Sequence, residues 1–233
     1  MDPVLTPEEL EALCNIPTPA ISNAIEAFNV RPHNVGFAGP SLRPVLAGAR
    51  PIAGYAATVL ARAGVRPDPG KKVSLRGYYE HILAVPAPRI AVVQDFDDPP
   101  VGAFWGEVQS NVHKALGCVG TVTHGGVRDL DEVAALGFQL FCTHVMVSHA
   151  YVHMVDYGIP VRVAGLEVRP GDLLVADKHG VINVPLEIAR EIPARVKKDE
   201  AAERVVIEYC RGGGVTPEEL AARFARMQEL RKQ

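Results

Sequence analysis

Two short, almost wholly apolar runs constrain the fold of this chain more than any other feature. They are Ile90–Gln94, bounded by prolines, and Val119–Thr123, followed by Gly125-Gly126. Apolar runs of this length between turn residues are typical of buried strands. Between them a helix is expected to begin near Gly106. Its expected apolar face consists of Val108, Val112, Ala115 and Leu116. The order strand, helix, strand with short connections predicts an α/β fold.

The last third of the chain carries four short apolar runs separated by turn residues. They are Pro160–Val163, Leu166–Val168, Leu173–Ala176 and Val181–Val184. Glycine and proline punctuate the gaps between them, so a meander of four strands is predicted. A helix from about Leu186 to Cys210 is expected to follow, with a kink at Pro193 because proline cannot donate to the helix ladder. An earlier strand is expected near Ala57–Leu60.

Threonine followed by proline marks three helix starts. Thr6-Pro7-Glu8-Glu9 and Thr216-Pro217-Glu218-Glu219 have the capping-box pattern, with proline in the first turn and Glu three residues after the Thr. Thr18-Pro19 opens a third helix. Its apolar positions follow the one-sided helical spacing at Ile21, Ala24, Ile25 and Phe28. Both ends of the chain are therefore expected to be helical.

The composition is that of a globular protein without a strong charge bias. The chain has 233 residues, 24 Lys+Arg against 27 Asp+Glu, a net charge of −3 and 48% apolar residues. Without a basic excess we expect no nucleic-acid partner. The uncharged stretch Val133–Val155 contains three histidines and is interpreted as buried core, so no membrane span is expected. Four widely spaced cysteines and no secretory signal favour a cytoplasmic protein with reduced thiols.

Charged residues at two chain reversals are the first candidates for a binding site. Arg128-Asp129 follows the second apolar run, at the strand end where α/β proteins bind ligands. Asp129 could equally be the N-cap of a helix that begins at Leu130. Glu107 follows Gly106 at an expected helix start, where free N–H groups can receive an anion. A first-turn Glu is also favoured simply by the helix dipole. The residue types alone leave both alternatives open.

The histidines and the nucleotide motifs give weaker signals. His149 and His153 would share one face of a helix, a known zinc arrangement, but their segment reads more like strand than helix. Core or interface roles are therefore favoured for these two and for His144. The sequence has no G-x-S-x-G, Walker A or complete G-x-G-x-x-G pattern, which excludes the commonest hydrolase and nucleotide-binding motifs.

The combination of these motifs resembles the RraA-like family, which includes 4-hydroxy-4-methyl-2-oxoglutarate / 4-carboxy-4-hydroxy-2-oxoadipate aldolases and regulators of ribonuclease E. Twenty residues separate Gly106-Glu107 from Arg128-Asp129, as in the family signature. The similarity covers about residues 15–210. Further similar segments are Pro17–Ile25, Gly54–Val59, Pro160–Asp172 and Asp177–Val181. The resemblance implies a single domain over residues 1–233, a swivelling-type β/β/α sandwich with flanking N- and C-terminal helices.

The resemblance also implies a metal-dependent lyase. Asp129 would hold Mg²⁺ or Mn²⁺ largely through waters, because a 2-oxo acid itself chelates the ion through two oxygens. Arg128 would stabilise the pyruvate enolate that forms on retro-aldol cleavage of a 4-hydroxy-2-oxo acid or on decarboxylation of oxaloacetate. Backbone amides of Gly106, Glu107 and Val108 would bind the carboxylate of this small 2-oxo acid.

The same resemblance implies a homotrimer or hexamer with the active site between subunits. A Glu from the C-terminal helix of a neighbouring subunit would act near the metal, and Glu203 matches best, with Glu200 one turn away. Two alternatives stay open. One is a non-enzymatic regulator that binds a ribonuclease or helicase, and the other is a homologue that acts on a different oxo or hydroxy acid.

Several positions depart from the family pattern. Glu107, a catalytic residue by this resemblance, replaces an Asp of the aldolases, and its extra methylene is expected to shift the acid/base geometry. Pro88-Arg89 replaces a Gly-Asp pair, and His113 replaces a small residue of the central helix. The segment with His144, His149 and His153 departs most. These differences bear on the half of the substrate that leaves, and they do not touch Arg128 or Asp129.

Overall fold

The structure is a computed structural model, and it describes residues 5–232. The helices are α1 (Pro7–Cys14), α2 (Thr18–Phe28), α3 (Leu75–Ala84), α4 (Glu107–Ala115), α5 (Leu130–Ala135), α6 (Ile192–Gly212) and α7 (Pro217–Lys232). The strands are β1 (Arg43–Pro44), β2 (Ile52–Arg62), β3 (Arg89–Asp95), β4 (Ala103–Trp105), β5 (Cys118–Val127), β6 (Gln139–Val145), β7 (His153–Tyr157), β8 (Val161–Val163), β9 (Leu166–Val168), β10 (Leu173–Asp177) and β11 (Gly180–Val184).

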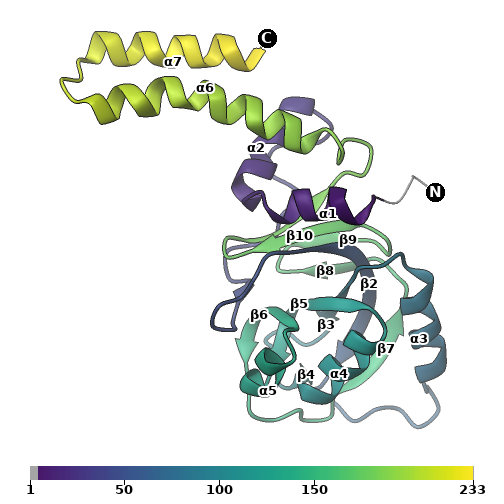
Figure 1. Cartoon of the computed structure of the whole chain (residues 1–233). Helices are drawn as coiled ribbons and strands as arrows, with labels where there is room; N and C mark the ends of the chain where they lie inside the picture. The colour runs from purple at the N-terminus through teal and green to yellow at the C-terminus, as the bar shows by residue number, and fades with distance from the viewer. Residues whose placement is uncertain (1–4, 233) are drawn as a thin grey trace.

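Most strands form one mixed sheet in the order β1-β6-β5-β3-β2-β10-β11, with β4 paired to β5 and β7 paired to β2. The pairs β2/β3, β3/β5, β5/β6 and β4/β5 are parallel, and β1, β7, β10 and β11 pair antiparallel. The strands β8 and β9 form a separate two-stranded sheet. The predicted α/β sandwich with helices at both ends is confirmed (Figure 1).

Two apolar cores lie on the two faces of the large sheet. On one face, side chains of α1, α2 and α6 such as Leu13, Ile21 and Ile192 pack on the sheet. On the other, Val163 and Leu166 of the small sheet pack against Ile90 of β3. Because both faces are covered, the central parallel strands are apolar nearly throughout, and β2 is buried over most of its length.

The expected helix starts at Thr6 and Thr216 are confirmed. The Glu9 N–H donates to Thr6 Oγ1 (3.2 Å) and the Thr6 N–H donates back to Glu9 Oε2 (2.8 Å), which completes a capping box at α1. At α7 the Glu219 N–H donates to Thr216 Oγ1 (3.3 Å). The third expected helix is α2, and Asp177 holds its start by accepting from the Thr18 N–H (2.9 Å) and hydroxyl (2.7 Å).

Three expectations about the second half of the chain are wrong in part. The four predicted strands exist, but they form two hairpins in different sheets rather than a meander, because β10 pairs with β2. Pro193 lies in the first turn of α6, where its missing N–H costs nothing, so it begins the helix instead of kinking it. Within Val133–Val155 only the first half is core, and Val147 is 94% exposed.

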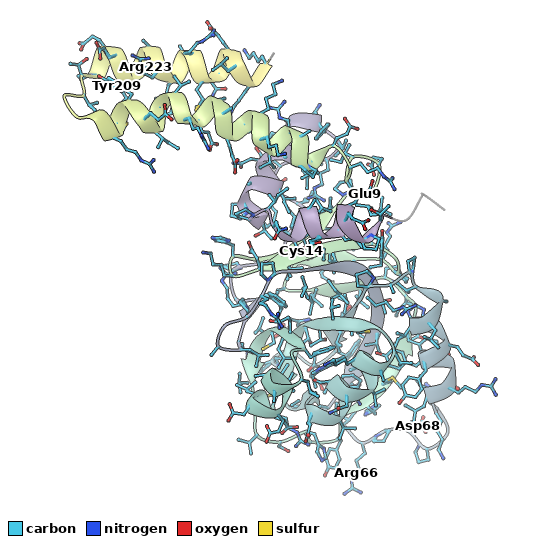
Figure 2. All side chains as sticks on the ribbon, in the orientation of Figure 1. Glu9, Cys14, Arg66, Asp68, Tyr209 and Arg223 are labelled. Carbon is cyan, nitrogen blue, oxygen red and sulfur yellow. The ribbon has the colours of Figure 1, made fainter. Side chains whose placement is uncertain are left out.

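The C-terminal helices extend away from the sheet. Figure 1 shows α6 and α7 as an antiparallel pair that projects from one end of the molecule, while α4 and α5 lie at the opposite end. Figure 2 shows Tyr209 and Arg223 on the two helices of this pair, and the Arg223 guanidinium stacks 5.3 Å from the centroid of the Tyr209 ring. None of the helices within residues 5–232 has the length and apolar character that crossing a bilayer requires.

Candidate active site

The site is built where two neighbouring parallel strands end. β4 ends at Trp105 and β5 ends at Val127, and these two residues are paired in register. The chain then enters α4 through Gly106 and α5 through Asp129. Ligands of α/β proteins bind at this edge of the sheet, so the expectation from sequence about where the charged residues would meet agrees with the topology.

The carboxylate of Asp129 faces the first turn of α4. Its Oδ2 accepts the backbone N–H of Glu107 (2.9 Å) and lies 3.7 Å from Nε of Arg128. Asp129 occupies the N-cap position of α5 but makes no capping bond to it, and its φ of +57° is left-handed. Asp adopts this left-handed conformation at a much lower conformational energy than a β-branched residue does. The side chain is therefore directed across to α4 instead of serving its own helix.

Gly106 is required by this close approach. A Cβ at position 106 would lie 2.4 Å from Asp129 Oδ2 and 3.2 Å from Cγ of Arg128. The backbone of Gly106 is extended, so space and not conformation excludes a side chain there. The result is a carboxylate, a guanidinium and the positive end of a helix within one small region.

A cleft of about 370 Å³ opens beside these groups. Of the predicted site residues, Gly106, Val108, Arg128 and Asp129 line it. Glu107 lies at its edge: the side chain is exposed, and the backbone N–H is the part bound to Asp129. The other lining residues are Pro67, Ala103, Phe104, Trp105, Gln109, His149, Ala150, Tyr151 and Val152.

The lining residues from 149 to 152 had no assigned role in the sequence. His149 was noted there as half of a zinc spacing, as a core or interface residue and as part of the segment that departs most from the family pattern, and Tyr151 was not singled out. The structure places His149 in a turn and His153 on β7, so the two do not share a helix face. His144 lies at the end of β6 with its Nδ1 2.7 Å from the Thr143 hydroxyl. A long loop that folds back over a strand end leaves no periodic signal from which it could be found.

A second basic residue stands near the mouth of the cleft. The Arg66 guanidinium lies 5.2 Å from the centroid of the Tyr151 ring. Figure 2 shows Arg66 at the end of the molecule farthest from Tyr209 and Arg223. The loop that carries it is anchored at its root, because Asp97 Oδ2 accepts the N–H groups of Ala63 (2.7 Å) and Gly64 (2.6 Å).

A network of buried hydrogen bonds connects the inner face of α4 to α3 and β4. His113 is fully buried, its Nδ1 donates to the Gln109 carbonyl (2.7 Å), and its Nε2 accepts from the Tyr78 hydroxyl (2.8 Å). Burial lowers the pKa of His113 to about 4 and raises that of Tyr78, so both are neutral. The Trp105 indole donates to Ser110 Oγ (2.9 Å), which donates to the Gly106 carbonyl (2.9 Å).

This network corrects the expected face of α4. Val108 was expected to be core, but it is 74% exposed, and the buried residues of the helix are Ser110 and His113. Two polar side chains can be buried there because each finds its hydrogen-bond partners. Arg89, which also departs from the family pattern, has a structural role: it donates to the carbonyls of Val85 (2.6 Å) and Leu116 (2.9 Å) at the ends of α3 and α4.

Glu203 and Glu200 lie on α6, at the opposite end of the molecule from the cleft (Figure 1). Glu203 accepts from Nη2 of Arg231 on α7, and Arg195 forms a two-point pair with Asp199 one turn earlier. Within one chain, therefore, neither Glu203 nor Glu200 joins the other predicted site residues.

The described side chains at the cleft offer a divalent ion one carboxylate, that of Asp129, and no complete set of protein ligands. Within residues 5–232 no three or more His, Cys, Asp or Glu side chains are grouped so that they could hold a metal ion. Asp129 offers one carboxylate whose Oδ1 makes no hydrogen bond to the described residues, and its side chain is 36% exposed. This suits an ion such as Mg²⁺ that keeps several waters and binds one or two carboxylates plus substrate oxygens.

The fold and the cleft together define a class of α/β proteins. In this class an Arg-Asp pair follows one strand and faces the start of the helix that follows the neighbouring parallel strand. The chain belongs to the RraA-like family, whose Aldolase/RraA model matches residues 18–183.

Two relatives show how far the similarity extends. Protein DlpA of Legionella pneumophila is 25% identical over 188 residues, which cover 80% of this chain and 29% of that protein. A protein of Halalkalibacterium halodurans named "Putative 4-hydroxy-4-methyl-2-oxoglutarate aldolase" is 30% identical over 125 residues, 52% of this chain and 60% of that protein. The matches therefore span less than two thirds of the length of both relatives.

Two solved structures share the fold. An uncharacterized protein from Pseudomonas syringae pv. tomato has a TM-score of 0.72 at 24% identity, covering 95% of this chain and 96% of its own. Streptomyces coelicolor RraAS2, described as an unusual member of the RNase ES inhibitor RraA protein family, has a TM-score of 0.69 at 23% identity, covering 90% and 98%. At these identities the likeness establishes the fold.

Proposed function

We propose that the chain is a divalent-metal-dependent lyase that cleaves 4-hydroxy-2-oxo acids to pyruvate, decarboxylates oxaloacetate, or does both. The observation that carries the proposal is the convergence of Arg128, Asp129 and the start of α4 on one cleft. Both reactions generate the same pyruvate enolate. One constellation that binds a carboxylate and stabilises an enolate oxygen therefore serves both.

Each group of the cleft has a distinct task. The N–H groups of the first turn of α4 that follow Glu107, whose own N–H is bound to Asp129, have no partner within the helix and would bind the substrate carboxylate, with Gly106 leaving the backbone accessible. The Arg128 guanidinium, one of whose Nη1 hydrogens faces the Val147 carbonyl (3.5 Å), would offer its remaining donors to the developing enolate oxygen. Asp129 would hold Mg²⁺ or Mn²⁺, which when bound withdraws electrons from the keto group of the substrate.

We also propose that another copy of the chain covers the cleft. Val108 and Tyr151, which line the cleft, and Val147, whose carbonyl faces Arg128, are between 50% and 94% exposed and offer apolar surface on which a partner can pack. Glu203 lies at the far end of its own chain, so it would reach a cleft only from a neighbouring copy. A trimer or hexamer in the cytoplasm is the assembly we propose, and four free cysteines agree with a reducing compartment.

The test is pyruvate release from oxaloacetate by the purified protein with Mg²⁺, with Mn²⁺ and with EDTA, after subtraction of the protein-free metal rate. Asp129→Ala should abolish the metal-dependent rate. Arg128→Ala should lower the rate by roughly 100-fold or more, as for loss of one oxyanion donor, while Mn²⁺ binding persists. A wild-type rate equal to the blank with both oxaloacetate and 4-hydroxy-4-methyl-2-oxoglutarate would contradict the proposal.

A further inference from the structure

Cleavage of a 4-hydroxy-2-oxo acid requires a base, and no residue that lines the cleft has so far been given that task. As the C3–C4 bond breaks, the proton of the C4 hydroxyl must leave. Of the residues that line the cleft, Asp129 and His149 carry the carboxylate and the imidazole, the two side-chain types there that commonly act as a general base. Asp129 already accepts the Glu107 N–H and is assigned to the metal. Among the side chains that line the cleft itself, His149 is the base that remains.

The turn that carries His149 is fixed by backbone contacts on both sides. The Ala103 N–H donates to the Ser148 carbonyl (2.9 Å), and the Tyr151 N–H donates to the Ala63 carbonyl (3.1 Å). A Cβ at Gly102 would lie 2.6 Å from the His149 carbonyl oxygen, so the turn packs directly on the backbone before β4. His149 is therefore attached to the strand end that leads into Gly106.

Within the turn the backbone is strained. Ala150 has a left-handed φ of +46°, which a residue with a Cβ rarely adopts. Two bonds hold it there: the Ala150 N–H donates to Ser148 Oγ (2.9 Å), and the Val152 N–H donates to the His149 carbonyl (3.0 Å). Backbone strain that the surroundings enforce is characteristic of functional sites.

The same turn selects the tautomer of the ring. His149 Nδ1 lies 2.8 Å from the Ala150 carbonyl oxygen, and because a carbonyl can only accept, Nδ1 must carry the hydrogen. In the neutral ring Nε2 then holds the lone pair, and it makes no hydrogen bond to the described residues. A fixed tautomer with a free Nε2 is the form in which an imidazole accepts a proton.

We propose that His149 is a catalytic residue, the base that moves the proton between the C4 hydroxyl and C3 of the substrate, and this rests on the lyase function proposed above. Nε2 takes the hydroxyl proton, the O–H electron pair becomes the π bond of the new carbonyl, and the C3–C4 pair stays on C3 as the pyruvate enolate. The imidazolium then returns its proton to C3. The products are pyruvate and a second carbonyl compound, with no net change in protons or electrons.

Pyruvate alone tests this role without the correct leaving group. By microscopic reversibility the group that protonates C3 also removes a proton from the methyl group of pyruvate. In D₂O with Mg²⁺ or Mn²⁺, wild-type protein should exchange these protons, as followed by NMR. His149→Ala should slow the exchange by about 100-fold or more, the usual contribution of a general base, and added imidazole should restore part of the rate. A residue with a merely structural role would not be rescued in this way.

The matched control is His153→Gln, because His153 also bonds a nearby carbonyl through Nδ1, at 2.7 Å from Tyr151 O, but lies outside the cleft lining. It should exchange at the wild-type rate. Oxaloacetate decarboxylation, run in parallel, has no hydroxyl proton to remove, so His149→Ala should lower it less than it lowers exchange.

The outcomes separate the two proposals. Exchange in His149→Ala at the wild-type rate overturns the role of His149 and leaves the lyase intact. Wild-type decarboxylation without any pyruvate exchange overturns it as well, because the enolate then forms with no base at C3. If the wild type shows no pyruvate exchange and releases no pyruvate from oxaloacetate or from 4-hydroxy-4-methyl-2-oxoglutarate, the lyase function is overturned and the role of His149 with it.

Discussion

At the scale of single residues, the site depends on contacts that leave no spare room. The Asp129 carboxylate does not cap α5, which follows it, but accepts the Glu107 N–H at the start of α4. This contact is possible only because residue 106 has no side chain. The sequence spacing brought Gly106, Arg128 and Asp129 to notice, but a spacing does not say which helix a carboxylate serves. That choice follows from the pairing of β4 with β5, which is a long-range contact.

Gly106→Ala should therefore impair turnover without unfolding the protein. The new Cβ would meet Asp129 Oδ2 at 2.4 Å, so the carboxylate or α4 must shift. Misplacement of reacting groups by about 1 Å can cost on the order of 100-fold in rate, and we expect a loss of roughly 10- to 100-fold in oxaloacetate decarboxylation. Gly212→Ala is the control, since a Cβ there meets nothing within 4 Å. Equal rates for the two variants would argue against the tight contact.

At the scale of elements, the parts that follow from local pattern were predictable and the parts that depend on tertiary contacts were not. The strands of the last third and the capped helices α1 and α7 follow from turn residues and cap chemistry. The face of α4 was wrong because hydrogen bonds from Trp105 and Tyr78 allow Ser110 and His113 to replace apolar residues inside. The loop over the cleft, with His149, carries no periodicity at all.

The burial of His113 gives the stability of the protein a pH dependence. Burial lowers its pKa to about 4 from 6.5, so the unfolded chain binds the proton more readily between these values. The stability from the neutral ring is fully present above pH 6.5 and is lost as pH falls toward 4, by at most roughly 3 kcal/mol. His113→Phe should be less stable than wild type at pH 7, because the Tyr78 hydroxyl loses its acceptor, and the difference should shrink toward pH 4.

Urea unfolding followed by the fluorescence of Trp105, the chain's single tryptophan, measures this between pH 4.5 and 7.5. Burial also lowers the pKa of His81 and His124, so the wild-type curve contains their contributions too. The comparison with His113→Phe isolates one ring. Parallel loss of stability in the two proteins would show that His113 is not the group responsible.

At the scale of the whole molecule, the predicted site residues fall at two ends. Arg128 and Asp129 line the cleft at the start of α4, whereas Glu203 lies on α6 and is held by Arg231. In Figure 1, α4 and the projecting α6 lie at opposite ends of the molecule. A single copy cannot bring them together. The exposed apolar residues around the cleft, among them Val147, provide a surface on which a second copy can pack.

Val147→Lys should weaken the assembly and lower turnover together. Val147 is 94% exposed in one chain, so a lysine there is tolerated by the fold but would be buried without a partner in an interface. Light scattering should show wild type above the 25.1 kDa of one chain and the variant shifted toward it. Leu83→Lys, at a 54% exposed position on α3, is the control and should assemble normally. A fully active wild-type monomer would contradict the shared site.

Complementation between two inactive variants decides whether the neighbouring Glu203 takes part. Asp129→Ala lacks the cleft carboxylate, and Glu203→Gln lacks the residue expected from the partner, so each alone should be inactive. When the two are co-expressed in equal amounts and mix at random, about a quarter of the sites combine an intact Asp129 with an intact Glu203 from the neighbour. Oxaloacetate decarboxylation should then recover toward a quarter of the wild-type rate. If the mixed oligomer has the wild-type size but its decarboxylation rate does not recover, Glu203 takes no part in the reaction. The intact cleft and the intact glutamate would then be present together without effect.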